Sequence, residues 1–98
     1  MDLGIKGKTA IVTASSGGLG EYAARALAAE GVNLVMFARS ADTLRAKATE
    51  ISQKHGVRVL PVAGDMRSEA DVDRLMIETE NEFGLAQILV LKIGRAHV

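Results

Sequence analysis

The sequence contains no cysteine and no tryptophan, one proline and only 3% aromatic residues among its 98 positions. Without cysteine, neither a disulfide framework nor a thiolate metal site can form. Lys and Arg number 12 and Asp and Glu number 12, so the formal net charge is zero. This balance lacks the basic excess of a general nucleic-acid-binding protein, and we expect no nucleic-acid partner.

Long apolar runs are also lacking. No stretch approaches the roughly 18 residues of a membrane-spanning segment, and residues 1–6 lack the apolar core of a secretory signal. We therefore expect a cytoplasmic protein with no membrane partner. The two histidines, His55 and His97, have no partner at metal-ligand spacing, so no metal site is expected. A hydrophobic share of 48% is typical of a globular chain of about one small domain.

Four short apolar runs alternate with three helical patterns along the chain. The runs are nearly continuous, which is typical of parallel strands covered by helices on both faces. Ser40 and Ser68 stand where two of the helices would begin, and Gly56 and Gly84 where they would end. The first helix is expected over residues 21–30, and the strands over residues 9–12, 33–37, 58–62 and 87–91.

Helical spacing predicts which residues each helix buries. In the first helix, small alanines on the buried side would allow close approach to a sheet. The expected buried residues are Leu19, Ala23, Ala26 and Leu27 in the first helix, Leu44, Ala48 and Ile51 in the second, and Val72, Leu75, Met76, Thr79 and Phe83 in the third.

The alternation predicts an α/β fold, a three-layer Rossmann-type doubly wound parallel sheet of which this chain forms the N-terminal half. The first four strands of such a fold lie in the spatial order 3-2-1-4. That order places the third strand at an edge, where proline is tolerated. The only proline, Pro61, falls in that strand.

Residues 13–20, Thr-Ala-Ser-Ser-Gly-Gly-Leu-Gly, link the first strand to the first helix. Glycines at such a turn let a phosphate approach the backbone, and the helix N-terminus offers unpaired N–H groups. A plain tight turn also favours glycine. A P-loop is excluded because Glu21 and Tyr22 follow Gly20 in place of Lys and Ser or Thr. A receiver domain built around Asp65 would need an acidic cluster after the first strand, and there is none.

This motif resembles the coenzyme loop of the short-chain dehydrogenase/reductase family, Thr-Gly-x-x-x-Gly-Ile/Leu-Gly. Thr13, Gly18, Leu19 and Gly20 match it, whereas Ala14 replaces the first glycine. Residues 12–20 are similar to the 3-oxoacyl-acyl-carrier-protein reductase-like branch, and the resemblance extends over residues 5–91. It implies a homo-oligomeric parent enzyme that reduces a carbonyl or oxidises a secondary alcohol of a small-molecule substrate by hydride transfer.

The residues after the second strand bear on the choice of coenzyme. An NAD site places an acidic side chain there, about 20 residues past the glycines. This chain has Arg39 and Ser40 instead, with no acid before Asp42. A guanidinium pairs with a 2′-phosphate through charge-assisted hydrogen bonds, so NADP(H) is favoured over NAD(H). A solvated arginine ahead of a helix is the alternative interpretation.

Further candidate coenzyme contacts follow the first and third strands. The resemblance implies that Asp65 accepts a hydrogen bond from the adenine amino group and that Met66 lines the adenine pocket. An ordinary turn role for Asp65 stays open. Ser15 and Ser16 are candidates for hydrogen bonds to ribose or phosphate oxygens, with loop solvation as the alternative.

No catalytic residue can be assigned in this chain. The family's Tyr-x-x-x-Lys pair has no counterpart, because the only tyrosine, Tyr22, is followed by Ala26 at the lysine position. We expect Tyr22 to pack in the fold or to contact the coenzyme.

Residues 92–98 break the family pattern and are interpreted as a non-native tail, with residues 1–91 forming part of a coenzyme-binding domain that is inactive alone. Two alternatives stay open: a non-catalytic dinucleotide-binding redox sensor or structural module, and a flavodoxin-like interaction domain without a nucleotide.

Overall fold

The computed structural model describes residues 6–13, 18–84 and 88–92, which form alternating strands and helices. The third and fourth strands lie one residue later than predicted, and the first helix begins earlier, at Gly18. In chain order the elements are β1 (Thr9–Thr13), α1 (Gly18–Ala29), β2 (Asn33–Ala38), α2 (Ala41–His55), β3 (Val59–Ala63), α3 (Glu69–Phe83) and β4 (Ile88–Lys92).

The four strands form one parallel sheet in the order β3-β2-β1-β4, which confirms the predicted Rossmann-type topology. At the carboxyl ends of the strands, Thr13 is aligned with Phe37, and Ala38 with Ala63. The edge position of β3 explains why proline is accepted there, since Pro61 has a neighbouring strand on one side only.

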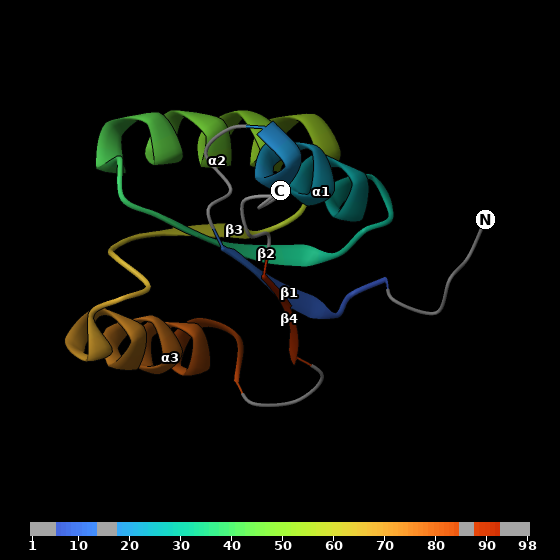
Figure 1. Cartoon of the computed structure of the whole chain (residues 1–98). Helices are drawn as coiled ribbons and strands as arrows, with labels where there is room; N and C mark the ends of the chain where they lie inside the picture. The colour runs from blue at the N-terminus through green and yellow to red at the C-terminus, as the bar shows by residue number, and fades with distance from the viewer. Residues whose placement is uncertain (1–5, 14–17, 85–87, 93–98) are drawn as a thin grey trace, which may run out of the picture.

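Helices cover both faces of the sheet, with α1 and α2 on one side and α3 on the other (Figure 1). Successive strand residues point to opposite faces of the sheet, so each of the two inner strands, β1 and β2, contributes side chains to both hydrophobic cores. Val12 and Leu34 join the core beneath α1 and α2, whereas Ile11 and Phe37 join the core beneath α3. All five residues of β1 are buried, as expected for a strand covered on both faces.

The face by which α1 meets the sheet differs from the predicted one. Its buried residues are Gly20, Ala24 and Ala28, while Leu19 is 69% exposed. Ala26 is also exposed, and Ala23 and Leu27 are half-buried. The helix therefore presents its smallest side chains to the sheet, at i, i+4 and i+8, which allows close packing of backbone against backbone.

The other two helices follow their predicted faces more closely. Leu44, Ala48 and Ile51 of α2 are all buried, as predicted. In α3, Leu75 and Thr79 are buried, but Met76 is 42% exposed. Val72 and Phe83 are half-buried.

The two serines before α2 and α3 act differently, although both have extended backbone angles. The Ser68 Oγ accepts a hydrogen bond from the Asp71 N–H at 3.2 Å, as a capping side chain does. Ser40 is the N-cap residue of α2, as its position predicts, but its side chain makes no cap hydrogen bond. Its side chain is left exposed at the carboxyl end of β2.

We expect Ser68→Ala to lower the free energy of unfolding by about 1 kcal/mol, because the Asp71 N–H loses its partner. Ser40→Ala is the matched control and should change it little. Urea denaturation of both variants measures the difference. Equal losses in the two variants would contradict the assignment of the cap to Ser68.

Candidate functional site

The N-terminus of α1 lies just beyond the carboxyl end of β1, with Gly18, Leu19 and Gly20 in its first turn. Gly18 has a φ of 58°, a left-handed conformation that favours glycine. Within the described part of the chain, nothing lies within 4 Å of where a Cβ on Gly18 would stand. Ser15 and Ser16, the other candidates of this loop, lie outside the described residues. This end of α1 combines open space with the positive end of a helix dipole.

Arg39 and Ser40 follow β2 directly, and both are exposed. Among the residues that the structure describes, no ion pair or side-chain hydrogen bond engages Arg39. The positive charge of Arg39 contributes to lowering the pKa of Asp65, so the two side chains are close enough to interact electrostatically. The chain thus presents an uncommitted guanidinium where a dinucleotide fold binds the adenosine ribose.

Asp65 and Met66 follow β3, on the strand next to β2. The Gly64 N–H donates to the Ala38 carbonyl at 2.9 Å, which carries the sheet pairing up to Asp65. The Asp65 side chain is 32% exposed, and Met66 is 40% exposed. Hydrogen bonds from the Arg67 guanidinium and backbone N–H lower the pKa of Asp65 to about 2. Asp65 is therefore ionised at neutral pH.

The turn from β3 to α3 is held by three hydrogen bonds around Asp65. The Asp65 N–H donates to Asp71 Oδ2 at 2.9 Å, and the Ser68 N–H donates to the Asp65 carbonyl at 3.0 Å. The third is the cap from Asp71 to Ser68 already described. The sequence placed Ser68 at the start of a helix, but it did not reveal that Asp71 and Arg67 both hold Asp65. The only sequence signal was the short spacing of acid and arginine in Asp65-Met66-Arg67.

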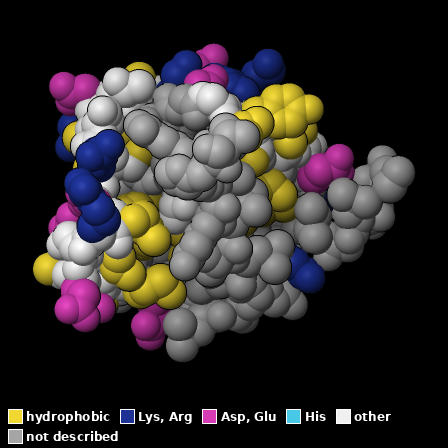
Figure 2. All heavy atoms as spheres, in the orientation of Figure 1, with side chains coloured by type: hydrophobic (Ala, Val, Ile, Leu, Met, Phe, Trp, Pro, Cys, Tyr) yellow, Lys and Arg dark blue, Asp and Glu magenta, His cyan; other side chains and the backbone are white. Residues whose placement is uncertain are grey.

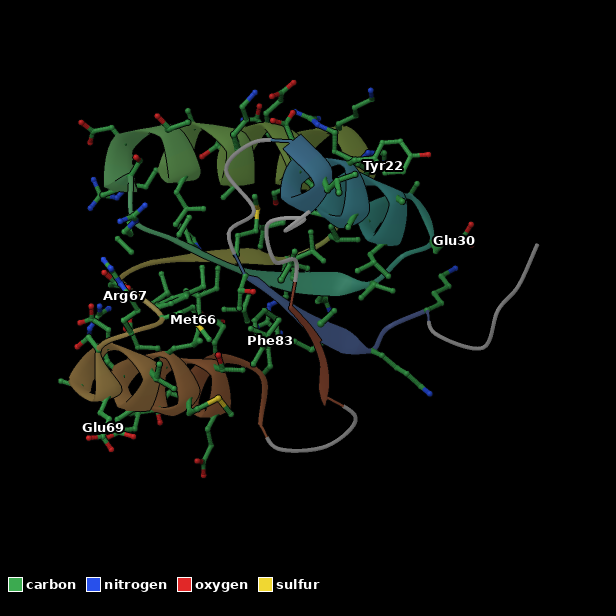
Figure 3. All side chains as sticks on the ribbon, viewed as in Figure 1. Tyr22, Glu30, Met66, Arg67, Glu69 and Phe83 are labelled. Atoms are coloured by element: carbon green, nitrogen blue, oxygen red, sulfur yellow. The ribbon has the colours of Figure 1, made fainter. Side chains whose placement is uncertain are left out.

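These groups gather at one edge of the sheet. The carboxyl ends of β1, β2 and β3 carry the α1 terminus, Arg39 and Asp65 respectively, the place where open α/β sheets bind ligands. Met66 and Arg67 lie at this edge, in the connection from β3 to α3 (Figure 3). Lysine or arginine side chains stand along the same edge between α2 and α3 (Figure 2). A helix N-terminus and a guanidinium suit a phosphate, and an ionised carboxylate suits an amino group.

Tyr22 stands on α1, two residues after Gly20. Its side chain is 75% exposed on α1, so the predicted packing role is wrong. It lies on the opposite side of the molecule from Met66 and Arg67 (Figure 3). Across the described ranges, no group of three or more His, Asp or Glu side chains is placed to hold a metal ion. Over the same ranges, none of the helices has the length and apolarity needed to cross a membrane.

Known proteins are similar in sequence to nearly the whole of this chain. D-beta-hydroxybutyrate dehydrogenase of Cupriavidus necator is 38% identical over 95 residues, covering 96% of this chain and 36% of that protein. A very-long-chain 3-oxoacyl-CoA reductase of Aspergillus clavatus is 36% identical over 94 residues, covering 96% of this chain and 27% of the relative. The chain thus spans about a third or less of the length of these relatives.

Solved structures show the same fold. L-sorbose reductase from Gluconobacter frateurii, complexed with NADPH and L-sorbose, superposes with a TM-score of 0.91 at 41% identity, over 99% of this chain and 37% of that one. An alcohol dehydrogenase from Thermococcus sibiricus, complexed with 5-hydroxy-NADP, gives 0.76 at 38% identity, over 79% and 33% of the two chains. The short chain dehydrogenase family model matches residues 8–98, and the chain belongs to this family.

Proposed function

We propose that this chain is the NADP(H)-binding part of an oxidoreductase that interconverts a carbonyl and a secondary alcohol. The observation that carries the proposal is the exposed Arg39 guanidinium at the carboxyl end of β2, which has no ion pair with any described residue and stands where an NAD-binding protein would have an acid. The NADPH and 5-hydroxy-NADP complexes of the two similar structures support it.

The described residues fit the coenzyme group by group. Gly18, Leu19 and Gly20 form the first turn of α1, whose main-chain N–H groups suit the pyrophosphate, and no described residue lies within 4 Å of a Cβ on Gly18. Arg39 and Ser40 are exposed and suit the 2′-phosphate. The ionised Asp65 suits the adenine amino group, with Met66 beside it. Ser15 and Ser16 stay predicted contacts of the ribose or phosphates. The bound coenzyme would supply or accept the hydride.

The proton-transfer residues of the reaction are proposed to lie outside this chain. Tyr22 is exposed on α1, away from Met66 and Arg67 in Figure 3, and Ala26 stands where the family's lysine would be. The same observation favours a second candidate, a non-catalytic dinucleotide-binding sensor or structural module. A serine and a Tyr-x-x-x-Lys motif encoded downstream in the parent gene would favour the oxidoreductase over the non-catalytic module.

The finer predictions about the parent protein stay proposals. They are the 3-oxoacyl-acyl-carrier-protein reductase-like branch, a homo-oligomeric assembly, a cytoplasmic location and an inactive isolated chain. We also propose that residues 1–91 are a partial coenzyme-binding domain and that residues 92–98 are non-native. Lys92 itself closes β4, and residues 93–98 lie outside the described part. Sequencing the source locus across codon 92 tests this division.

Titration of the full-length protein that carries this chain, followed by the fluorescence of the reduced coenzyme, tests the proposed function. We expect saturable binding of NADPH, at least about 10-fold tighter than binding of NADH, a difference of about 1.4 kcal/mol. Absence of binding to either coenzyme would overturn the proposal and leave a nucleotide-free interaction domain as the better interpretation.

A further inference from the structure

The carboxylate of Asp65 is held by a single neighbour, Arg67, from two directions. Oδ1 accepts from the Arg67 backbone N–H at 2.8 Å and from Nε at 3.2 Å, while Oδ2 accepts from a terminal guanidinium nitrogen at 2.9 Å. Such a fork fixes the plane of the carboxylate, which a lysine with its point charge would not do.

The fork leaves room for one more donor. An ionised carboxylate has about four lone-pair positions, two on each oxygen. Within the described part of the chain, both positions on Oδ1 and one on Oδ2 of Asp65 are filled. The remaining position belongs to Oδ2, and the side chain is 32% exposed, so a ligand can reach it.

The backbone of Asp65 is fixed independently of the fork. Asp71 holds its N–H and Ser68 holds its carbonyl. The hydrogen bonds from Arg67 therefore determine the side-chain torsions of Asp65, while other residues hold its backbone. This separates the role of Arg67 from the stability of the turn, because the turn keeps its own hydrogen bonds when the guanidinium is removed.

Arg67 and Arg39 lie at the same edge of the sheet but differ in their ion pairing. Arg67 is committed to Asp65, and the pair is neutral as a unit. No ion pair commits Arg39 among the residues that the structure describes, which leaves its charge available to a phosphate. The second arginine of this edge is thus better suited to orient the adenine acceptor than to bind the 2′-phosphate.

We propose that Arg67 is a positioning residue for the adenine end of the coenzyme: its guanidinium holds the Asp65 carboxylate in the one orientation that leaves an Oδ2 lone pair for the adenine amino group. The proposal rests on the proposed function, since it requires an adenine dinucleotide at this edge.

Two variants of the full-length protein and one coenzyme analogue test the proposal. Nicotinamide hypoxanthine dinucleotide phosphate carries an oxygen in place of the adenine amino group, so it lacks the amino hydrogen that Asp65 would accept. Arg67→Ala is expected to weaken NADPH binding about 5-fold, the size of one exposed ion pair, and to leave binding of the reduced hypoxanthine analogue unchanged. Arg67→Lys keeps the charge without the fork, and we expect the same pattern from it.

Arg45→Ala is the matched control, because Arg45 is also an exposed arginine, 72% accessible on α2, and its only described partner is Asp42 at 3.9 Å. It should leave binding of both coenzymes unchanged. An equal loss for NADPH and the analogue in Arg67→Ala, restored in Arg67→Lys, would overturn the proposal and assign Arg67 to a phosphate. Unchanged NADPH binding in both Arg67 variants would also overturn it.

The titration of Asp65, followed by carboxyl NMR without coenzyme, separates this proposal from the proposed function. Removing the guanidinium should raise the pKa of Asp65 from about 2 toward the ordinary aspartate value of about 3.9. An unshifted pKa would show that the fork does not form and would overturn the role of Arg67. A shifted pKa in a protein that binds no NADPH would instead overturn the proposed function.

Discussion

Replacing Arg39 with aspartate is expected to invert the coenzyme preference of the full-length protein, changing the ratio of NADPH to NADH affinity by about 100-fold. The guanidinium would lose charge-assisted hydrogen bonds of about 1.5–3 kcal/mol each to the 2′-phosphate. The new carboxylate would repel that phosphate and accept from the ribose 2′-hydroxyl of NADH. Because Arg39 is exposed and screened by solvent, we expect less than the full sum of these contributions; a 100-fold change corresponds to about 2.7 kcal/mol.

The variant should keep its fold, because Arg39 is exposed and no described side chain depends on it. Arg45→Asp is the matched control: it makes the same charge change on an exposed part of α2. Competition titrations with the two coenzymes measure the ratio in each variant. An unchanged ratio in Arg39→Asp, or an equal change in Arg45→Asp, would show that position 39 does not select the coenzyme.

Arg39→Asp also brings a second acid close to Asp65. Arg39 contributes to lowering the pKa of Asp65, but the hydrogen bonds from Arg67 are the larger cause. We therefore expect Asp65 to stay ionised at neutral pH in the variant. The hydrogen bond that we propose between Asp65 and the adenine amino group would then form with either coenzyme, so the change in preference would report the contact with the 2′-phosphate alone.

The sheet could be predicted from the sequence because its strands are recognisable as short runs of apolar residues. β1 and β2 are continuous apolar runs, and both are buried on two faces. Pro61 indicated an edge strand because proline has no N–H to donate to a neighbouring strand, and β3 does lie at the edge. Gly56 indicated the end of α2 correctly and has a φ of 68° there.

The buried face of α1 was predicted to carry small alanines, but the wrong ones were chosen because Leu19 and Leu27 were placed on the same face. Leu19 is exposed, and Gly20, Ala24 and Ala28 face the sheet. Close contact between a helix and a sheet requires the smallest side chains at the interface, which hydrophobicity scales rank below leucine. Met76 was misassigned for a related reason, since helical spacing alone does not show where the sheet ends beneath α3.

In the candidate site too, some residues could be predicted from the sequence and others could not. Arg39 and Asp65 were found because each follows a strand whose end is visible in the sequence, and the parallel sheet brings strand ends together. Arg67 and Asp71 were missed because their role depends on side-chain torsions within the turn between β3 and α3. Neither hydrophobic period nor family motif encodes those torsions.

Gly64, which joins β3 to Asp65, is expected to be intolerant of even one methyl group. A Cβ at this position would lie 2.7 and 2.8 Å from two ring atoms of Phe37, closer than carbon atoms pack. The Phe37 ring is 1% exposed in the core beneath α3, so it cannot simply move aside. Overpacking of this kind costs about 1–3 kcal/mol.

Gly64 has none of the left-handed backbone angles found at other glycines of this chain, so alanine meets no backbone strain there. Restricting the unfolded chain would by itself stabilise Gly64→Ala by about 0.4–1 kcal/mol. The steric term is the larger, and we expect a net loss of about 1–2 kcal/mol. Urea denaturation of the full-length protein measures it, and a neutral or stabilised variant would contradict the predicted contact.

A double-mutant cycle with Phe37→Leu identifies the cause of the loss, because leucine lacks the outer ring atoms that the new methyl group would meet. In the Phe37→Leu background, the remaining close neighbour of the new methyl group is the end of the flexible Arg74 side chain at 3.1 Å, which can move aside at little cost. Gly64→Ala should therefore become close to neutral or stabilising there. The resulting coupling energy is expected to lie near 1–2 kcal/mol, within the range of about 0.5–3 kcal/mol found for contacting residues. If the loss were the same in both backgrounds, the glycine would instead be required by the turn that carries Asp65.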